Sequence, residues 1–349
     1  MTIKIAGRPI GADHPPFIIA EMSGNHNQDI NRALEIVEAA ARAGAHAIKL
    51  QTYTADTMTL DKSGGSFQIN DDSSLWSGKN LHELYKLAYT PWEWHEPIME
   101  RARELGLICF SSPFDETAVD FLVGLNIPAF KIASFENNHL PLIAKAASTG
   151  KPLIISTGMA SLGELELAVN TAREAGCKEI ILLKCTSTYP ASPENTNIRT
   201  ISHLRNLFHT EVGLSDHTMG LGVAVASVAL GASVIEKHFT LARKDGGVDS
   251  AFSLEPQEMA NLVVESERAW QALGTVRYGP TEAENKSLVF RRSIYVAQDI
   301  NEGDLFTKEN IRIVRPGDGA PPHLYKQILG RKARRAYSSG TPLSLEQLL

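Results

Sequence analysis

The sequence of 349 residues predicts an α/β fold, in which a (β/α)8 TIM barrel is followed by a small C-terminal domain. Eight near-continuous apolar runs of strand length occur along the chain, as expected for parallel strands that are buried on both faces. Helical segments separate these runs. Eight such strand–helix units between residues 17 and 274 match the usual size of this barrel.

The predicted strands follow one another at intervals that suit a barrel. They are FIIAE (17–21), AIKLQ (47–51), LICFSS (107–112), AFKIAS (129–134), LIIST (153–157), IILLKCTS (180–187), EVGLSDH (211–217) and SVIEKHF (233–239). An open doubly wound sheet is the alternative fold. That fold usually has fewer strands and often a glycine fingerprint after the first one, and no GxGxxG follows FIIAE.

The segments between the strands carry helix signals. Apolar residues recur at helical spacing after Asp29, a candidate N-cap, and Gly44 follows the end of this helix. Ser161 and Glu164 have the spacing of a capping box, which predicts a second helix that runs up to Gly176.

Segments that depart from this alternation of strands and helices define the domain organisation. Turn residues in GRPIG predict a hairpin within residues 1–16. The barrel domain then extends over 1–274, with a long insertion at 52–90 of the kind that is often functional. A polar stretch at 275–290 predicts a linker, and 291–349 has the strand signals SIYVAQDI and IRIVRP of a second small domain.

Composition and charge exclude several classes of protein. Apolar residues make up 43% and charged residues 21%, values of a globular chain. A net charge of −6 argues against a general nucleic-acid binder. No apolar run reaches the length of about 18 residues that spans a membrane, and the start lacks a signal-peptide layout. Three cysteines without a CxxC pair predict a protein of the reducing cytoplasm.

Hydroxyls and lysines gather at the carboxyl ends of the predicted strands, where barrel enzymes carry their chemistry. Phosphate oxygens each accept several hydrogen bonds, and lysine supplies a compact positive charge. The set therefore predicts a phosphate site, although any one serine is equally well explained by a turn. Its members are Lys49, Lys131, Ser111, Ser112, Ser134, Ser156, Ser187 and Ser215.

The lysines leave a second interpretation open, because some barrel aldolases use a lysine as a Schiff-base nucleophile. Lys49 and Lys131 are our candidates for anion contacts. Lys237 alternates away from Glu236 and His238, so we expect it to face the helices and form a salt bridge.

Two histidines are the clearest indication of a metal site in the sequence. His217 and His238 end neighbouring strands, so their imidazoles can converge on a divalent ion such as Mn2+, Co2+ or Zn2+, with oxygen ligands and water. Asp216 or Glu236 could support them in the outer shell. Among the carboxylates, Glu21 and Glu136 are candidates for a general base, and we favour Glu21 because it ends an apolar strand. His26 and His95 are weaker candidates; we expect the first near the rim and the second on a helix.

Eight blocks along the chain resemble the sialic acid (N-acetylneuraminate) synthase family, whose members condense phosphoenolpyruvate with an amino sugar. They are AEMSGNHN (20–27), KLQTYTADTMTL (49–60), SSPFD (111–115), KIASFEN (131–137), STGMAS (156–161), CTSTYPA (185–191), GLSDHT (213–218) and EKHFTL (236–241). The C-terminal FRRSIYV, GDLFTKENIRIVRPGDG and GTPL are similar to the antifreeze-like SAF domain, a β-clip fold. The resemblance covers essentially the whole chain.

Within this family, several blocks resemble the pseudaminic acid synthase branch. AEMSGNHN stands where N-acetylneuraminate synthases have AEIGxNHNG, and KIASFE stands where they have KIGSGE. SLWSGKNLHELY, TPWEWH and FRRS are also similar to that branch. The implied reaction is a metal-dependent condensation of phosphoenolpyruvate with 2,4-diacetamido-2,4,6-trideoxy-L-altrose, which releases phosphate by C–O cleavage. N-acetylneuraminate or legionaminate synthesis is the alternative, followed by another metal-dependent barrel aldolase.

The resemblance also implies a role for each matching residue. Those matching phosphoenolpyruvate contacts are Lys49, Ser112, Lys131, Ser134, Ser156, Ser187 and Ser215, and those on the sugar side are Gln51, Tyr189 and Asp249. His217 and His238 match metal ligands, with Mn2+ expected and Co2+ or Mg2+ as alternatives. Glu21 matches a catalytic carboxylate. Arg315 matches an arginine that the SAF domain of the partner subunit inserts over the active site, which implies a domain-swapped homodimer.

A non-catalytic interpretation remains beside the enzymatic ones. SAF-like sequences also occur in ice-binding proteins, so the chain could be a binding or structural protein. Paired histidines and lysines on one rim speak against this, because a binding scaffold has no need for them.

Overall fold

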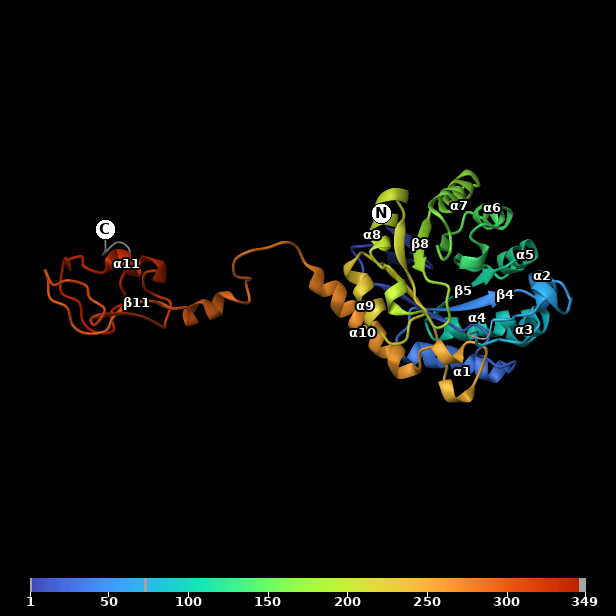
Figure 1. Ribbon diagram of the computed structural model, residues 1–349, viewed down its shortest axis with the longest axis horizontal. Coiled ribbons are helices and arrows are strands. Elements are labelled where there is room, and N and C mark those ends of the chain that lie inside the picture. The colour runs from blue at the N-terminus through green and yellow to red at the C-terminus, as the bar shows by residue number, and fades with distance from the viewer. Residues whose placement is uncertain (1, 72–73, 345–349) are drawn as a thin grey trace. The chain divides into compact units, whose positions relative to one another are not determined.

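The computed structural model describes residues 2–71 and 74–344, and the chain forms two compact units, residues 1–274 and 275–349 (Figure 1). The first unit is a closed barrel of eight parallel strands in the order β10-β3-β4-β5-β6-β7-β8-β9. The strands are β3 (Phe17–Glu21), β4 (Ala47–Thr52), β5 (Ile108–Pro113), β6 (Phe130–Ile132), β7 (Leu153–Ser156), β8 (Ile180–Cys185), β9 (Glu211–Ser215) and β10 (Val234–His238). The prediction of a TIM barrel is therefore confirmed.

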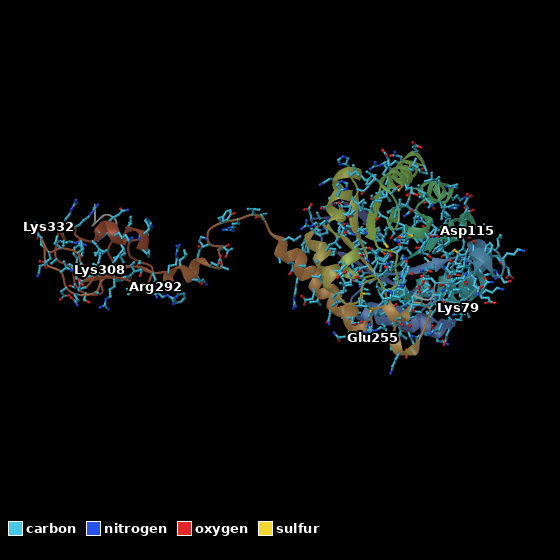
Figure 2. The ribbon with its side chains drawn as sticks, viewed as in Figure 1. Lys79, Asp115, Glu255, Arg292, Lys308 and Lys332 are labelled. Carbon is cyan, nitrogen blue, oxygen red and sulfur yellow. The ribbon has the colours of Figure 1, made fainter. Side chains whose placement is uncertain are left out.

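Helices follow the strands and cover the outside of the barrel (Figure 1). They are α1 (Ile30–Arg42), α2 (Ala55–Met58), α3 (Leu81–Ala88), α4 (His95–Glu104), α5 (Glu116–Gly124), α6 (Leu140–Ala147), α7 (Leu162–Glu174), α8 (Thr200–Phe208), α9 (Gly222–Ala229) and α10 (Pro256–Leu273). Asp29 caps α1, and Ser161 and Glu164 form the predicted capping box of α7. Asp115, labelled in Figure 2, caps α5 in the same way by accepting from the backbone of Thr117 and Ala118.

One end of the barrel is closed by the N-terminal hairpin. Strands β1 (Ile3–Ile5) and β2 (Arg8–Ile10) pair antiparallel, as GRPIG predicts. Their buried isoleucines pack in one cluster with side chains of the barrel interior, among them Phe17, Phe110 and Ile154. Because apolar side chains fill this end, polar groups inside the barrel can face a ligand only at the carboxyl ends of the strands.

Five of the strands, β6 to β10, end earlier than the predicted apolar runs. β8 ends at Cys185 and β9 at Ser215, so Ser187 and His217 lie two residues beyond their strands. Ser134 opens a short 3-10 helix, η3 (Ser134–Glu136). Beyond these strand ends, the backbone groups form hydrogen bonds with loop residues and no longer with the neighbouring strand. The carbonyl of His217, for example, accepts from the backbone N–H of Ala191.

The second unit has its own small core. Strand β11 (Ser293–Val296) pairs antiparallel with β12 (Ile311–Val314), where the sequence predicts two strands, and α11 (Tyr325–Ile328) follows. The core includes Ile294, Phe306 and Leu343, all buried. The stretch predicted to be a linker also contains a 3-10 helix, η7 (Asn285–Phe290). In the part of the chain that is described, no helix has both the length and the apolar character needed to cross a membrane.

Lys237 faces the helices, as its place in the alternation of β10 predicts. Its ammonium group is completely buried and lies 2.9 Å from Asp216 Oδ2. It also donates to the carbonyls of Thr218 and Gly220. The pair therefore ties β10 to the loop that follows β9.

Replacing Lys237 by Met should lower the free energy of unfolding by about 3–5 kcal/mol, because Asp216 is left as a buried, uncompensated charge. The surface pair Arg268–Glu265 provides a control, and Arg268→Met should cost less than about 1 kcal/mol. Urea unfolding followed by tryptophan fluorescence reports on the barrel unit, because all four tryptophans lie within residues 76–270. Equal losses in the two variants would contradict this account.

Candidate active site

A cavity of about 690 Å3 opens at the carboxyl ends of the barrel strands. Most of the predicted site residues line it: Lys49, Gln51, Lys131, Ser134, Glu136, Ser156, Ser187, Tyr189, Ser215, His217, His238 and Asp249. Glu21 and Ser112 lie directly behind Lys49 and contact its ammonium group. Arg315 belongs to the second unit, where it follows β12. The barrel thus brings these residues together around one cavity. Two other candidates lie elsewhere, since Ser111 Oγ bonds with Thr52 Oγ1 at 2.6 Å and Asp216 pairs with Lys237.

The buried ammonium group of Lys49 is held from several sides. Its Nζ lies 2.5 Å from Glu21 Oε2 and 3.8 Å from Glu236 Oε2, and it donates to Ser112 Oγ at 3.2 Å. Glu21 also accepts from the backbone of Ser23 and from Gln51 Nε2, at 3.1 and 3.0 Å. Burial raises the pKa of Glu21 to about 7, although Lys49 acts to lower it.

Glu236 is a central member of the site that sequence reasoning placed only in the outer shell of a metal. Its Oε1 lies 3.5 Å from Lys131 Nζ and accepts from Ser215 Oγ at 2.9 Å. It therefore contacts both lysines of the predicted phosphate site. The alternation of β10 could have revealed this, because Glu236 and His238 are two residues apart and so face the same side of the strand.

The serine hydroxyls converge around a glycine. Ser134 Oγ accepts from the backbone N–H of Gly158 at 3.2 Å, and Ser156 Oγ is buried without a hydrogen-bond partner. A methyl group on Gly158 would overlap Ser187 Oγ and Ser134 Oγ. The absence of a side chain at this position lets the hydroxyls approach one another, and together with Lys131 they form a concave group of donors suited to an anion.

The two predicted metal-binding histidines lie side by side, with ring centroids 5.3 Å apart. His217 Nδ1 donates to the carbonyl of Thr186 at 2.9 Å, so the neutral imidazole has its lone pair on Nε2. His238 Nδ1 lies 3.6 Å from Asp249 Oδ2. Within residues 2–71 and 74–344, no group of three His, Cys, Asp or Glu side chains is arranged to hold a metal. The donor set therefore fits an ion whose other ligands are water and substrate.

The insertion at 52–90, which its length marked as a candidate functional segment, supplies an apolar and aromatic wall whose residues were given no individual role from the sequence. Met58, Ile69, Leu84 and Tyr85 line the cavity with Trp76, whose Nε1 donates to the carbonyl of Val248 at 3.0 Å. The ring of Tyr189 connects this wall to the histidines, since its centroid lies 5.9 Å from that of Trp76 and 4.4 Å from that of His217. The cavity thus has a charged end inside the barrel and an apolar mouth.

The two weaker histidine candidates lie outside the lining of this cavity. His26 Nε2 bonds with Thr90 Oγ1 at 3.2 Å. His95 begins helix α4, and its Nε2 bonds with Thr52 Oγ1 at 2.7 Å. Burial lowers the pKa of each to about 4, so both are neutral hydrogen-bonding groups of the packed interior.

Comparison with known proteins agrees with the geometry. The sequence profile described as the NeuB family matches residues 36–278. The chain belongs to the NeuB family. A SAF domain profile matches residues 291–349, so this NeuB-family chain has the two-domain composition that its sequence predicts.

Three relatives show how closely this NeuB-family chain matches known proteins. The pseudaminic acid synthase of Helicobacter pylori is 43% identical over 336 residues, which is 96% of this chain and 98% of that one. The N,N'-diacetyllegionaminic acid synthase of Legionella pneumophila is 38% identical, covering 99% of this chain and 98% of that one. The crystal structure of the N-acetylneuraminic acid synthetase of Leptospira borgpetersenii matches with a TM-score of 0.74 and 32% identity, over 82% of this chain and 95% of that one.

The buried carboxyl group of Glu136 should make stability depend on pH. Burial raises the pKa of Glu136 from 4.5 to about 7, with Lys131 opposing the shift, and Oε2 has no hydrogen-bond partner. Because the folded state holds this proton more tightly than the unfolded chain, the stabilisation is complete below pH 4.5 and is lost as pH rises through 7.

A Glu136→Gln variant should therefore match the wild type near pH 4 and be more stable at pH 8, by up to about 3 kcal/mol. Urea unfolding of both proteins at the two pH values, followed by tryptophan fluorescence, measures the difference. A difference that does not grow with pH would contradict the assignment of a buried, neutral carboxyl group.

Proposed function

We propose that this chain is a pseudaminic acid synthase that condenses phosphoenolpyruvate with open-chain 2,4-diacetamido-2,4,6-trideoxy-L-altrose and releases inorganic phosphate. The observation that carries the proposal is the pair of buried lysines, surrounded by hydroxyls, in the same cavity as His217 and His238. The 43% identity to the Helicobacter pylori pseudaminic acid synthase supports this product over the N-acetylneuraminate and legionaminate alternatives.

Phosphoenolpyruvate occupies the charged end of the cavity in this proposal. Lys49 and Lys131 bind its carboxylate and phosphate as point charges, and the hydroxyls orient the oxygens. The hydroxyls are those of Ser112, Ser134, Ser156, Ser187 and Ser215. Lys49 already pairs with Glu21 at 2.5 Å, which favours an ammonium group and not a Schiff-base nucleophile.

The sugar acceptor lies at the mouth of the cavity, between Gln51, Tyr189 and Asp249. The C3 carbon of phosphoenolpyruvate attacks the aldehyde carbon, which leaves a cation at C2 next to the carboxylate. Water adds at C2, and the resulting tetrahedral intermediate loses phosphate as its C2–O bond breaks. Holding both reactants in line lowers the entropic barrier, an effect worth roughly 7–11 kcal/mol at its best.

Glu21 is the proposed general base for the water, with Glu136 as the alternative. The pKa of each is raised by burial to about 7, close to the pH at which a base works best. Each carboxyl group can then accept a proton from water and return it without a large change in free energy.

His217 and His238 would hold a divalent cation, with Mn2+ expected. Such an ion, when bound, polarises the aldehyde oxygen as a Lewis acid. The hydrogen bond from His217 Nδ1 to Thr186 fixes the tautomer that presents Nε2 to the cavity.

Phosphate release with different acceptors tests the function. After EDTA treatment and addition of Mn2+, phosphoenolpyruvate with the diacetamido-trideoxy-altrose should release phosphate, and phosphoenolpyruvate with N-acetylmannosamine should release much less. If the bridging oxygen of phosphoenolpyruvate carries 18O, the label should appear in the phosphate. Release with N-acetylmannosamine alone would indicate an N-acetylneuraminate synthase, and release with neither acceptor would favour the aldolase alternative.

Single replacement of either histidine should abolish the metal dependence. His217→Ala and His238→Ala should each lower kcat by at least about 100-fold, because removing one ligand or its support typically costs that much. Addition of Mn2+ should restore the EDTA-treated wild type and neither variant. Full activity in one variant would contradict the metal assignment.

The active assembly in this proposal is a cytoplasmic, domain-swapped homodimer in which Arg315 of the partner subunit covers each cavity. The resemblance to sialic acid synthases supports the swap, and the three unpaired cysteines support a reducing compartment. A guanidinium group in this position would close the mouth of the cavity over two anionic reactants.

Complementation between inactive chains tests the swap. Arg315→Ala and His217→Ala chains should each be inactive alone. Co-expressed, they should regain about a quarter of wild-type activity, because half of the dimers are mixed and one of their two sites is intact. No recovery in a purified mixed dimer would show that each site uses the arginine of its own chain.

A further inference from the structure

Ser23 adopts a backbone conformation that its side chain disfavours. It lies two residues after β3, is 3% exposed, and has φ of 49°. A residue with a Cβ is strained in this left-handed region, where glycine is free of strain. Such strain persists where surrounding contacts fix the residue, and it often marks a functional position.

The hydroxyl of Ser23 connects two residues that we place on the sugar side of the cavity. Its Oγ donates to Asp249 Oδ2 and accepts from Gln51 Nε2 at 3.3 Å. The second hydrogen of the Gln51 amide goes to Glu21 Oε1 at 3.0 Å. Both side chains that share this hydroxyl line the cavity, and Asp249 Oδ2 is itself 3.6 Å from His238 Nδ1.

We propose that Ser23 is a positioning residue for the sugar acceptor. Its hydroxyl holds Asp249 and Gln51 in place through one hydrogen bond to each. The second carboxylate oxygen of Asp249 and the amide oxygen of Gln51 are then oriented to bind the sugar. This inference rests on the proposed function, because it assigns these two residues to the acceptor and not to phosphoenolpyruvate.

The chemistry of the position explains why serine is present at a strained site. Glycine would remove the strain and the bridge together. Serine keeps the bridge, and the hydrogen bond to the buried carboxylate of Asp249 offsets the backbone strain.

Two substitutions separate the bridge from the strain. Ser23→Gly removes both, and Ser23→Ala removes only the bridge. In each variant the KM for the sugar acceptor should rise about tenfold, while the KM for phosphoenolpyruvate changes less than about twofold. The thermal midpoint of Ser23→Gly should not fall below that of the wild type, whereas that of Ser23→Ala should fall.

His209→Gly is the matched control. His209 is exposed, has φ of 51° and follows helix α8 outside the cavity lining. Relief of strain there should raise the thermal midpoint and leave both KM values unchanged. The proposal would be overturned if the KM for the sugar acceptor were unchanged in both Ser23 variants. It would also be overturned if the KM values for the acceptor and for phosphoenolpyruvate rose equally and the thermal midpoint of Ser23→Gly fell.

A stability cycle keeps this result distinct from failure of the proposed function. If the wild type releases no phosphate with any acceptor, the proposed function fails. The cycle of Ser23→Ala with Asp249→Asn still measures the bridge, because it needs no substrate. A clear coupling between the two substitutions is expected, and additive effects would overturn the bridge.

Discussion

Two lysine ammonium groups are buried inside the barrel, and each is stabilised by a carboxylate that is buried with it. Lys49 pairs with Glu21 at 2.5 Å, and Lys131 lies 3.5 Å from Glu236. Isolated charges at these depths would lose their protons or disrupt the core, so the two acids are needed before any ligand arrives. The remainder of the site is arranged around this charged group.

The barrel determines the direction from which a ligand enters the site. Isoleucines of the N-terminal hairpin close one end, so an anion can reach the lysines only from the carboxyl ends of the strands. The histidines and Ser23 come next along this path, and Trp76 of the insertion lines the mouth. A small anion inside and a larger, partly apolar sugar outside fit this order.

Much of the fold could be predicted because its signals are local. Buried parallel strands appear as continuous apolar runs, and the capping residues of α1 and α7 appear at fixed spacing. Glu236 was placed only beside the metal, because sequence alone does not show which side chains meet across a barrel. Ser23 was missed because a serine after a strand resembles a turn residue, and its backbone angle is not visible in the sequence. Trp76 lies in a block that the sequence analysis named, but its place in the cavity wall was not predicted because the insertion has no regular periodicity.

Binding of phosphoenolpyruvate in the absence of the sugar tests the role of the buried lysines most directly. Isothermal titration should show that Glu236→Gln retains binding, because it removes a competing negative charge. The double variant Lys131→Met with Glu236→Gln should bind about 10- to 100-fold more weakly, and it leaves no unpaired buried charge at these positions. Lys79→Met, a change at an exposed position in the insertion, serves as the control. Wild-type affinity in the double variant would contradict the account.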